Sequence, residues 1–253
     1  MRDTILKAEH LKKVFTSGKK SFTAVEDVSF ELKRGQCLGI VGESGSGKST
    51  IAGMLTRLTD VTDGKIMLMG RDITNVRGKE LRKVYQDMQM VFQMPMESFD
   101  PRHTLGDGIG ESLRNIGISR RETKKRTEEL LVKCGLTPEF ASRYPHQVSG
   151  GQCQRASIAR ALAVKPSILI CDEATSALDV TVQKQILELL MELKEKESLS
   201  LLLICHDLAL VQAFCDEALV LRQGRVVERG IPDEIVNHPK EDYTKILVAS
   251  VLS

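Results

Sequence analysis

A glycine-rich stretch, GESGSGKST, runs from Gly42 to Thr50 and limits what the rest of the chain can fold into. An apolar run, residues 37–41, precedes it, and the apolar residues among 51–58 that follow are spaced as one helical face. A strand, a glycine loop and a helix in this order form a phosphate site, because the loop's N–H groups and the helix N-terminus attract anions. A chance glycine turn before a surface helix would not need so many positions in register. The stretch therefore predicts an α/β chain that binds a nucleoside triphosphate.

The residues of this loop have distinct expected roles. Gly42, Gly45 and Gly47 allow the backbone to turn tightly and to approach phosphate oxygens closely. Lys48 is expected to reach the β- and γ-phosphates, and Ser49 offers a hydroxyl to Mg²⁺. The cofactor-binding prediction covers the whole loop: Gly42, Glu43, Ser44, Gly45, Ser46, Gly47, Lys48, Ser49 and Thr50.

Two carboxylates end a second apolar run, residues 167–173. A buried strand gains nothing from unpaired charge, so structure alone does not explain the acid pair. Magnesium and water do: Asp172 would hold the metal through its hydration shell, and Glu173 would polarise the attacking water. We therefore expect a hydrolytic site rather than a passive nucleotide pocket.

Polar side chains are also expected at the ends of two other strands. Gln93 is predicted as the last residue of a strand within 81–93, and His206 follows the apolar run 199–205. The carboxyl ends of strands are where α/β folds place ligand-contacting groups. A lone histidine is more often a structural residue, but this one would share its edge of the sheet with Gln93 and Glu173.

A third feature is the sequence YPHQVSGGQ, residues 144–152, which interrupts one helical pattern before the next begins. Ser149 is a good N-cap, and Gly150 and Gly151 leave backbone amides bare at the helix start. A plain helix cap is the alternative, but two adjacent glycines cost helix stability. A second anion site is therefore expected here.

Two residues upstream of the loop are candidates for adenine contact. Phe15 and Val25 lie in β-rich sequence, where an adenine ring needs a flat or apolar surface. The alternative is that Phe15 is a buried strand aromatic, and the pattern alone favours this core packing.

Composition excludes several classes of function. The 253 residues are 42% hydrophobic and 28% charged, which suits one large globular domain. A net charge of +2 and the absence of Trp argue against a nucleic-acid partner. The six cysteines have no CxxC spacing, so they predict small core residues rather than disulfides or a metal site. No apolar run approaches the length of a bilayer span, so a cytoplasmic chain is expected.

Taken in order, these motifs resemble those of the ATP-binding cassette (ABC) ATPases over nearly the whole chain. GESGSGKS resembles the Walker A motif, VSGGQ the signature, ILICDE Walker B and SALD the D-loop, while Gln93 and His206 resemble the Q- and H-loop residues. A P-loop kinase would not explain SGGQ shortly before Walker B. Val148 replaces the usual Leu of the signature, and Cys153 follows it where Gln or Arg is frequent.

The resemblance implies one ABC ATPase domain over residues 1–253, an α/β P-loop NTPase fold. Its RecA-like core and N-terminal antiparallel β-subdomain would span about 1–93 and 158–253, with an inserted α-helical subdomain at about 94–157. The implied activity is hydrolysis of ATP with Mg²⁺, coupled to transport across a membrane.

The resemblance also implies a role for each motif residue. Two cassettes would meet head to tail, with the signature of each on the γ-phosphate held by the other. Phe15 would stack on adenine, Glu173 would act as the base, and His206 would sense the γ-phosphate. The residues implied in catalysis are Lys48, Gln93, Glu173 and His206. Those implied in metal binding are Ser49, Gln93 and Asp172. Beyond the glycine loop, the residues implied in nucleotide contact are Phe15, Val25, Gln93, Ser149, Gly150, Gly151, Gln152 and Asp179.

A narrower resemblance concerns two stretches that are similar to ATPases of di/oligopeptide and nickel importers. These are MESFDPRHTLGDGIGESL after Gln93 and NHPKEDYTKIL near the C-terminus. The implied partners are a second, different cassette, two membrane-spanning permease subunits and, indirectly, a solute-binding protein, at the cytoplasmic face of the inner membrane. The substrate could be a peptide, nickel or a metal chelate. A non-transport ABC ATPase acting on nucleic acid or ribosomes is the alternative. Members of the family that act on chromosomes have a long coiled coil between Walker A and the signature, and residues 50–149 leave no room for one. Members that act in translation have two cassettes in one chain, and only one is present here.

Overall fold

The apolar strand that precedes the glycine loop lies inside a large sheet. The computed structural model describes residues 3–18, 20–174 and 178–251. Within them the sheet has ten strands in the order β5-β4-β1-β2-β10-β9-β3-β8-β7-β6. The strands are β1 (Thr4–Ser17), β2 (Lys20–Lys33), β3 (Cys37–Val41), β4 (Asp63–Leu68), β5 (Arg71–Asp72), β6 (Met88–Val91), β7 (Ile168–Asp172), β8 (Ser200–Cys205), β9 (Glu217–Arg222) and β10 (Arg225–Gly230).

The sheet has a parallel half and an antiparallel half. Strands β6, β7, β8, β3 and β9 are mutually parallel, so their carboxyl ends share one edge. Strands β2, β1, β4 and β5 pair antiparallel, and β10 joins the halves by pairing with β9 and β2. The predicted α/β fold with an N-terminal antiparallel part is therefore confirmed.

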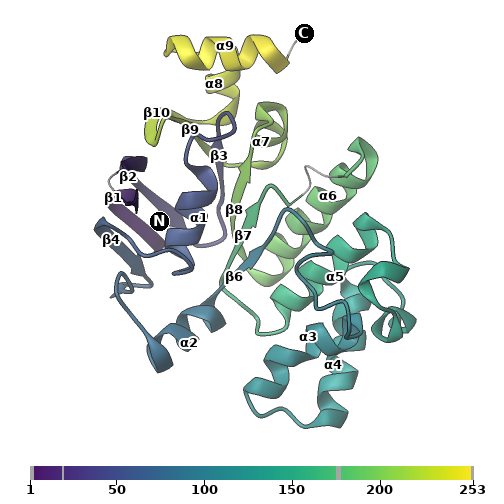
Figure 1. Ribbon diagram of the computed structural model, residues 1–253. Coiled ribbons are helices and arrows are strands. Elements are labelled where there is room, and N and C mark those ends of the chain that lie inside the picture. The colour runs from purple at the N-terminus through teal and green to yellow at the C-terminus, as the bar shows by residue number, and fades with distance from the viewer. Residues whose placement is uncertain (1–2, 19, 175–177, 252–253) are drawn as a thin grey trace.

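Helices cover both faces of the parallel half, which is why its strands are mostly apolar. The helices are α1 (Lys48–Leu55), α2 (Gly78–Asp87), α3 (Leu105–Asn115), α4 (Arg120–Lys133), α5 (Gly150–Leu162), α6 (Val180–Glu197), α7 (Leu208–Phe214), α8 (Pro232–Asn237) and α9 (Asp242–Val251), with two short 3₁₀ helices, Pro138–Ser142 and Pro145–Gln147. In Figure 1, α1 lies between the antiparallel strands and the parallel ones, and α8 and α9 lie at the end of the molecule beyond β9.

Successive residues of the central strands alternate between two apolar layers. Leu38 and Ile40 of β3 pack in the layer that holds α1 and the antiparallel strands. Cys37 faces the other layer, with α5 and α6, and Val41 faces the part of that layer that holds α7, α8 and α9. Because β3 is buried on both faces, the glycine loop that follows it starts from a fixed point.

A helical segment lies between β6 and β7. It contains α3, α4, the two 3₁₀ helices and α5, and hydroxyl side chains cap all three α-helices: Thr104, Ser119 and Ser149. The subdomain division at about 94–157 stays a prediction. Helix α5 itself continues through residue 157 as one uninterrupted helix.

Other expectations can be compared directly with the structure. The predicted hairpin turn at Gln223-Gly224 is present, and both residues have positive φ, as a two-residue hairpin turn requires. The strand predicted to end at Gln93 ends at Val91 instead, so Gln93 lies in the loop that follows. All six cysteines are free, and five of them are buried.

In the part of the chain that the structure describes, no helix combines the length and the apolar character needed to cross a membrane.

Burial on both faces predicts a high sensitivity of β8 to truncation. Leu202 is fully buried between β3 and β7, so Leu202→Ala should lower the free energy of unfolding by about 3 kcal/mol. Urea denaturation measures this free energy. Val132→Ala, on the exposed side of α4, is the control and should change the free energy of unfolding by less than about 0.5 kcal/mol. Equal losses in the two variants would contradict the assignment of β8 to the core.

Candidate nucleotide-binding site

The glycine loop connects β3 to α1, and two of its glycines are required by their surroundings. A Cβ on Gly42 would lie 2.2 Å from the carbonyl oxygen of Leu221, and one on Gly47 would lie 2.5 Å from that of Ala24. Gly47 also has φ of 106°, a conformation that side chains disfavour. The loop therefore fits only as a bare backbone, held between β9 and β2.

Lys48, the first residue of α1, lies inside the curve of the loop. Its Nζ donates hydrogen bonds to the carbonyl oxygens of Gly42 at 2.7 Å and Glu43 at 2.8 Å. The same nitrogen lies 4.0 Å from the Oε1 atom of Glu173. Burial lowers the pKa of Lys48, and the negative charge of Glu173 acts in the opposite direction. The structure thus brings together the residue predicted to reach the β- and γ-phosphates and the residue predicted to polarise the attacking water.

Ser49 and Asp172 form a second pair at the same edge of the sheet. The hydroxyl of Ser49 donates a hydrogen bond to the Oδ1 atom of Asp172 at 3.1 Å. Burial at the end of β7 raises the pKa of Asp172, and the bond from Ser49 opposes this rise. A hydroxyl and a carboxylate oxygen are donors that Mg²⁺ prefers, so the residues present fit that ion.

Glu173 has an unusual backbone conformation. Its φ is 46°, and its N–H donates a hydrogen bond to the carbonyl oxygen of Ile204 at 2.8 Å. A non-glycine residue in this region costs about 1–3 kcal/mol and is found mostly where surrounding structure imposes it at functional sites. Here the chain turns away from β7 directly after Asp172, and the carboxylate of Glu173 faces Lys48.

A hollow of about 370 Å³ opens beside these residues. Its lining residues come from β1, β2, the glycine loop, α1 and the loops after β6 and β7: Phe15, Phe22, Ala24, Ser44, Gly45, Gly47, Lys48, Ser49, Thr50, Gln93 and Glu173. The predicted loop, Gln93 and Glu173 therefore meet at one cavity. The loop residues Gly42, Glu43 and Ser46 are not among the residues that line it.

The aromatic wall of the hollow contains Phe15 and one residue that was not predicted, Phe22. Phe15 is 45% exposed, so it is no buried strand aromatic, and its partner across the β1–β2 ladder is Phe22, 63% exposed. The sequence reasoning missed Phe22, although the pairing of two aromatics across a hairpin was a signal available in the sequence. Val25 is fully buried beside Gly47, and its neighbour Ala24 lines the hollow instead.

The remaining single-residue predictions lie outside this hollow. His206 follows β8 at the same edge and is exposed. Asp179 caps α6, and its side chain accepts a hydrogen bond from the N–H of Val182 at 2.9 Å. Ser176 and Ala177 of the SALD stretch lie outside the described residues.

The second predicted anion site is a capped helix start. The N–H of Gln152 donates to the hydroxyl of Ser149 at 3.3 Å, and the N–H of Ser149 donates to the Oε1 atom of Gln152 at 2.9 Å. No acidic residue lies in the first turn of α5, as expected. A Cβ on Gly151 would lie 2.5 Å from Val182, so this glycine also permits close packing of α5 on α6. None of these residues lines the hollow at the glycine loop, and Figure 1 shows α5 well apart from α1.

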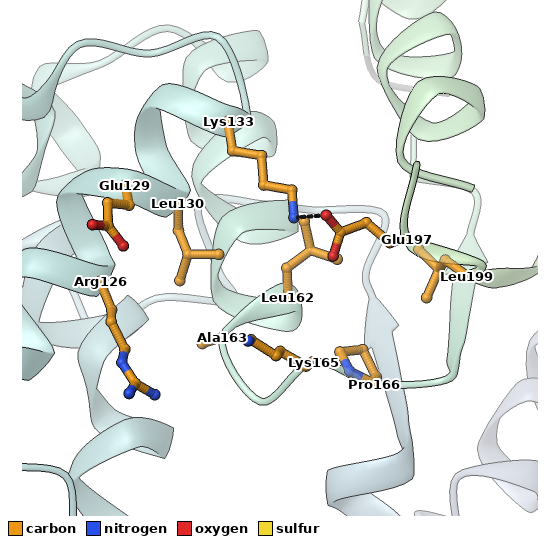
Figure 2. A pocket seen from close by; sticks show the side chains of 10 residues that line it. All are labelled: Arg126, Glu129, Leu130, Lys133, Leu162, Ala163, Lys165, Pro166, Glu197 and Leu199. Atoms are coloured by element: carbon orange, nitrogen blue, oxygen red, sulfur yellow. Dashed lines mark ion pairs between the residues drawn. The ribbon is translucent and has the colours of Figure 1, made fainter. Parts of the chain in front are cut away.

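A cavity of about 460 Å³ lies elsewhere, between α4, the α5–β7 connection and the end of α6. Figure 2 shows Lys133 and Glu197 joined across it, with an N–O distance of 2.5 Å. It shares no residue with the hollow at the glycine loop and lies away from every predicted site residue.

Comparisons with known proteins agree with this geometry. Residues 25–176 match the family described as ABC transporter. The chain is 44% identical to the oligopeptide transport ATP-binding protein OppF of Salmonella typhimurium, covering 95% of this chain and 72% of that protein. It is 46% identical to a probable peptide ABC transporter ATP-binding protein of Sinorhizobium fredii, covering 99% of this chain and 73% of that one.

A solved structure has the same fold. The dimeric ATP-binding cassette MJ0796, in a post-hydrolysis state with ADP and Pi, superimposes with a TM-score of 0.82 at 30% identity, over 90% of this chain and 98% of that one. The chain therefore belongs to the ABC transporter family and is one of its ATP-hydrolysing cassettes.

Proposed function

We propose that this chain is the ATP-hydrolysing subunit of a bacterial importer of di- or oligopeptides. The observation that carries the site assignment is the meeting of Lys48, Ser49 and Glu173 at one cavity, with Asp172 at the end of β7 hydrogen-bonded to Ser49. The peptide substrate is supported by the relatives, whose names refer to oligopeptide and peptide transport rather than to nickel.

The residues at and beside the cavity have proposed parts in hydrolysis. The loop amides and Lys48 bind the β- and γ-phosphates, and the exposed pair Phe15 and Phe22 provides the surface on which adenine stacks. Glu173 orients and deprotonates the attacking water. Ser49, Asp172 and Gln93 would hold Mg²⁺, which when bound neutralises charge on the phosphates.

A second cassette is proposed to complete the site. Ser149 and the amides of Gly150 and Gly151 form an anion-attracting helix start that this chain does not direct at its own hollow. A partner cassette facing it head to tail would receive this helix start on its γ-phosphate, with Asp179 and His206 close to the shared surface. The dimeric state of the similar cassette MJ0796 supports such a pair.

The membrane partners are proposed from the same relatives. Two permease subunits would receive the movement of the cassettes through the loop after Gln93, and a solute-binding protein would deliver the peptide to them. In this arrangement the chain acts at the cytoplasmic face of the inner membrane. ATP favours the closed pair because it binds that state better, and hydrolysis removes the preference.

Removing the loop cation tests the phosphate site. Lys48→Ala should weaken ATP binding about 10- to 100-fold, because a charge-assisted contact to phosphate is lost. Calorimetric titration of the purified chain measures this. Lys124→Ala, on the exposed side of α4, is the matched control and should bind as the wild type does. Unchanged affinity in Lys48→Ala would contradict the phosphate-loop assignment.

Neutralising the proposed base separates binding from hydrolysis. Glu173→Gln should retain ATP affinity within about threefold and lose about 10²–10⁴-fold in turnover, since the amide cannot accept the proton of water. Phosphate release from the purified transporter complex gives the rate, with Glu129→Gln as the control for a lost surface carboxylate. Hydrolysis at the wild-type rate would remove Glu173 from this role.

The identity of the partners is tested by capture from the native cells. The Glu173→Gln chain, held in its ATP-bound state with Mg²⁺, should copurify with two polytopic membrane proteins and a second cassette, identified by mass spectrometry. The Lys48→Ala chain should recover much less of the second cassette, because closure of the pair needs ATP. Recovery of ribosomal or DNA-bound proteins in place of membrane proteins would reject the importer and leave the ATPase chemistry.

A further inference from the structure

The C-terminal helix is in direct contact with the glycine loop. The N–H of Glu43, the second residue of the loop, donates a hydrogen bond to the hydroxyl oxygen of Tyr243 at 3.0 Å. Tyr243 is the second residue of α9 and is 5% exposed. The N–H of Glu43 is therefore directed at this chain's own hydroxyl rather than at a phosphate.

The position of Tyr243 is fixed on several sides. Its ring lies in an apolar cluster with Val41 at the end of β3 and with Leu247 one turn further along α9. The guanidinium of Arg222 covers the ring, with its Cζ atom 4.8 Å from the centroid. The hydroxyl thus belongs to a side chain with little freedom to leave the loop.

The start of α9 is fastened to the sheet as well. The carboxylate of Glu228 in β10 accepts hydrogen bonds from the N–H groups of Lys240 at 3.0 Å and Glu241 at 3.2 Å. Burial opposes ionisation of this group, but the hydrogen bonds it accepts outweigh that effect and lower the pKa of Glu228. The segment that carries Tyr243 is therefore anchored to a strand that is part of the main sheet.

A second contact holds the loop further along. The N–H of Gly224, in the β9–β10 turn, donates a hydrogen bond to the carbonyl oxygen of Ser46 at 2.8 Å. The loop is thus fastened at Glu43 by α9 and at Ser46 by the turn. At the entry of the loop, the carbonyl groups of Gly42 and Glu43 also accept hydrogen bonds from Lys48.

We propose that Tyr243 is a positioning residue for nucleotide binding, whose hydroxyl keeps the entry of the glycine loop in the conformation that receives phosphate. The inference rests on the proposed nucleotide site. A loop already ordered by its surroundings binds its ligand at a lower entropic cost than one that must be ordered on binding. Because Tyr243 does not line the hollow that Lys48 and Glu173 share, the effect falls on affinity rather than on the chemical step.

The test is Tyr243→Phe in the full chain, which keeps the ring, its apolar contacts and its stacking with Arg222. ATP affinity by calorimetric titration should fall about five- to tenfold, the change expected from losing one buried hydrogen bond. In the purified transporter complex, KM for ATP should rise by the same factor, with kcat within about twofold. The nucleotide-free unfolding midpoint should drop by no more than about 4 °C.

A second measurement follows the bond itself. Hydrogen exchange of the Glu43 amide without nucleotide should be faster in Tyr243→Phe than in the wild type, because its acceptor is gone. Tyr85→Phe, a partly exposed tyrosine on α2, is the matched control and should change neither exchange at Glu43 nor ATP affinity.

The outcomes distinguish this role from the site on which it rests. If Lys48→Ala binds ATP as the wild type does, the phosphate site itself is wrong. If Lys48→Ala loses affinity while Tyr243→Phe keeps it, only the positioning role is overturned. A Tyr243→Phe chain that loses kcat and thermal stability with unchanged KM would also overturn it, since that pattern describes a purely structural residue.

Discussion

The closeness of two backbone carbonyl groups to the glycine loop sets the geometry on which the rest of the site depends. The oxygens of Leu221 and Ala24 leave no space for a side chain at Gly42 or Gly47, so the loop follows the surface of β9 and β2 as bare backbone. The ammonium of Lys48 then lies inside the curve, bonded to the loop's own carbonyl groups. The sheet therefore shapes the loop before any ligand arrives.

The parallel half of the sheet supplies the opposing charges. Strand β7 runs beside β8 and next but one to β3, so its terminal carboxylates arrive at the edge where the loop begins. Asp172 is buried there at the end of β7 and accepts a hydrogen bond from Ser49, and Glu173 is turned toward Lys48 by a backbone conformation that few residues adopt. Removing two carboxylates from water is costly, and the nearby cation and hydroxyl offset part of that cost.

Much of this arrangement could be predicted from the sequence because short patterns encode it. The strand–loop–helix order around Lys48, the acid pair after an apolar run and the turn at Gln223-Gly224 each depend on residues within one segment. The partnership of Phe15 with Phe22 depends on the register of a hairpin, and the burial of Val25 in place of Ala24 depends on which face of β2 meets the loop. The bond from Glu43 to Tyr243 joins residues 200 positions apart, and no local pattern records such a contact.

The order of strands has a consequence for how the chain is made. Strand β3 emerges early in synthesis, but both of its neighbours, β8 and β9, come from the last quarter of the chain. Until residue 222 has left the ribosome, the apolar strand beneath the glycine loop lacks one or both of its partners, and at least one of its edges is open to mispairing or to a chaperone. The acceptor for Glu43 arrives later still, at residue 243. Nucleotide binding is thus among the last properties that the growing chain acquires. A chain that binds ATP is therefore one in which the sheet is complete.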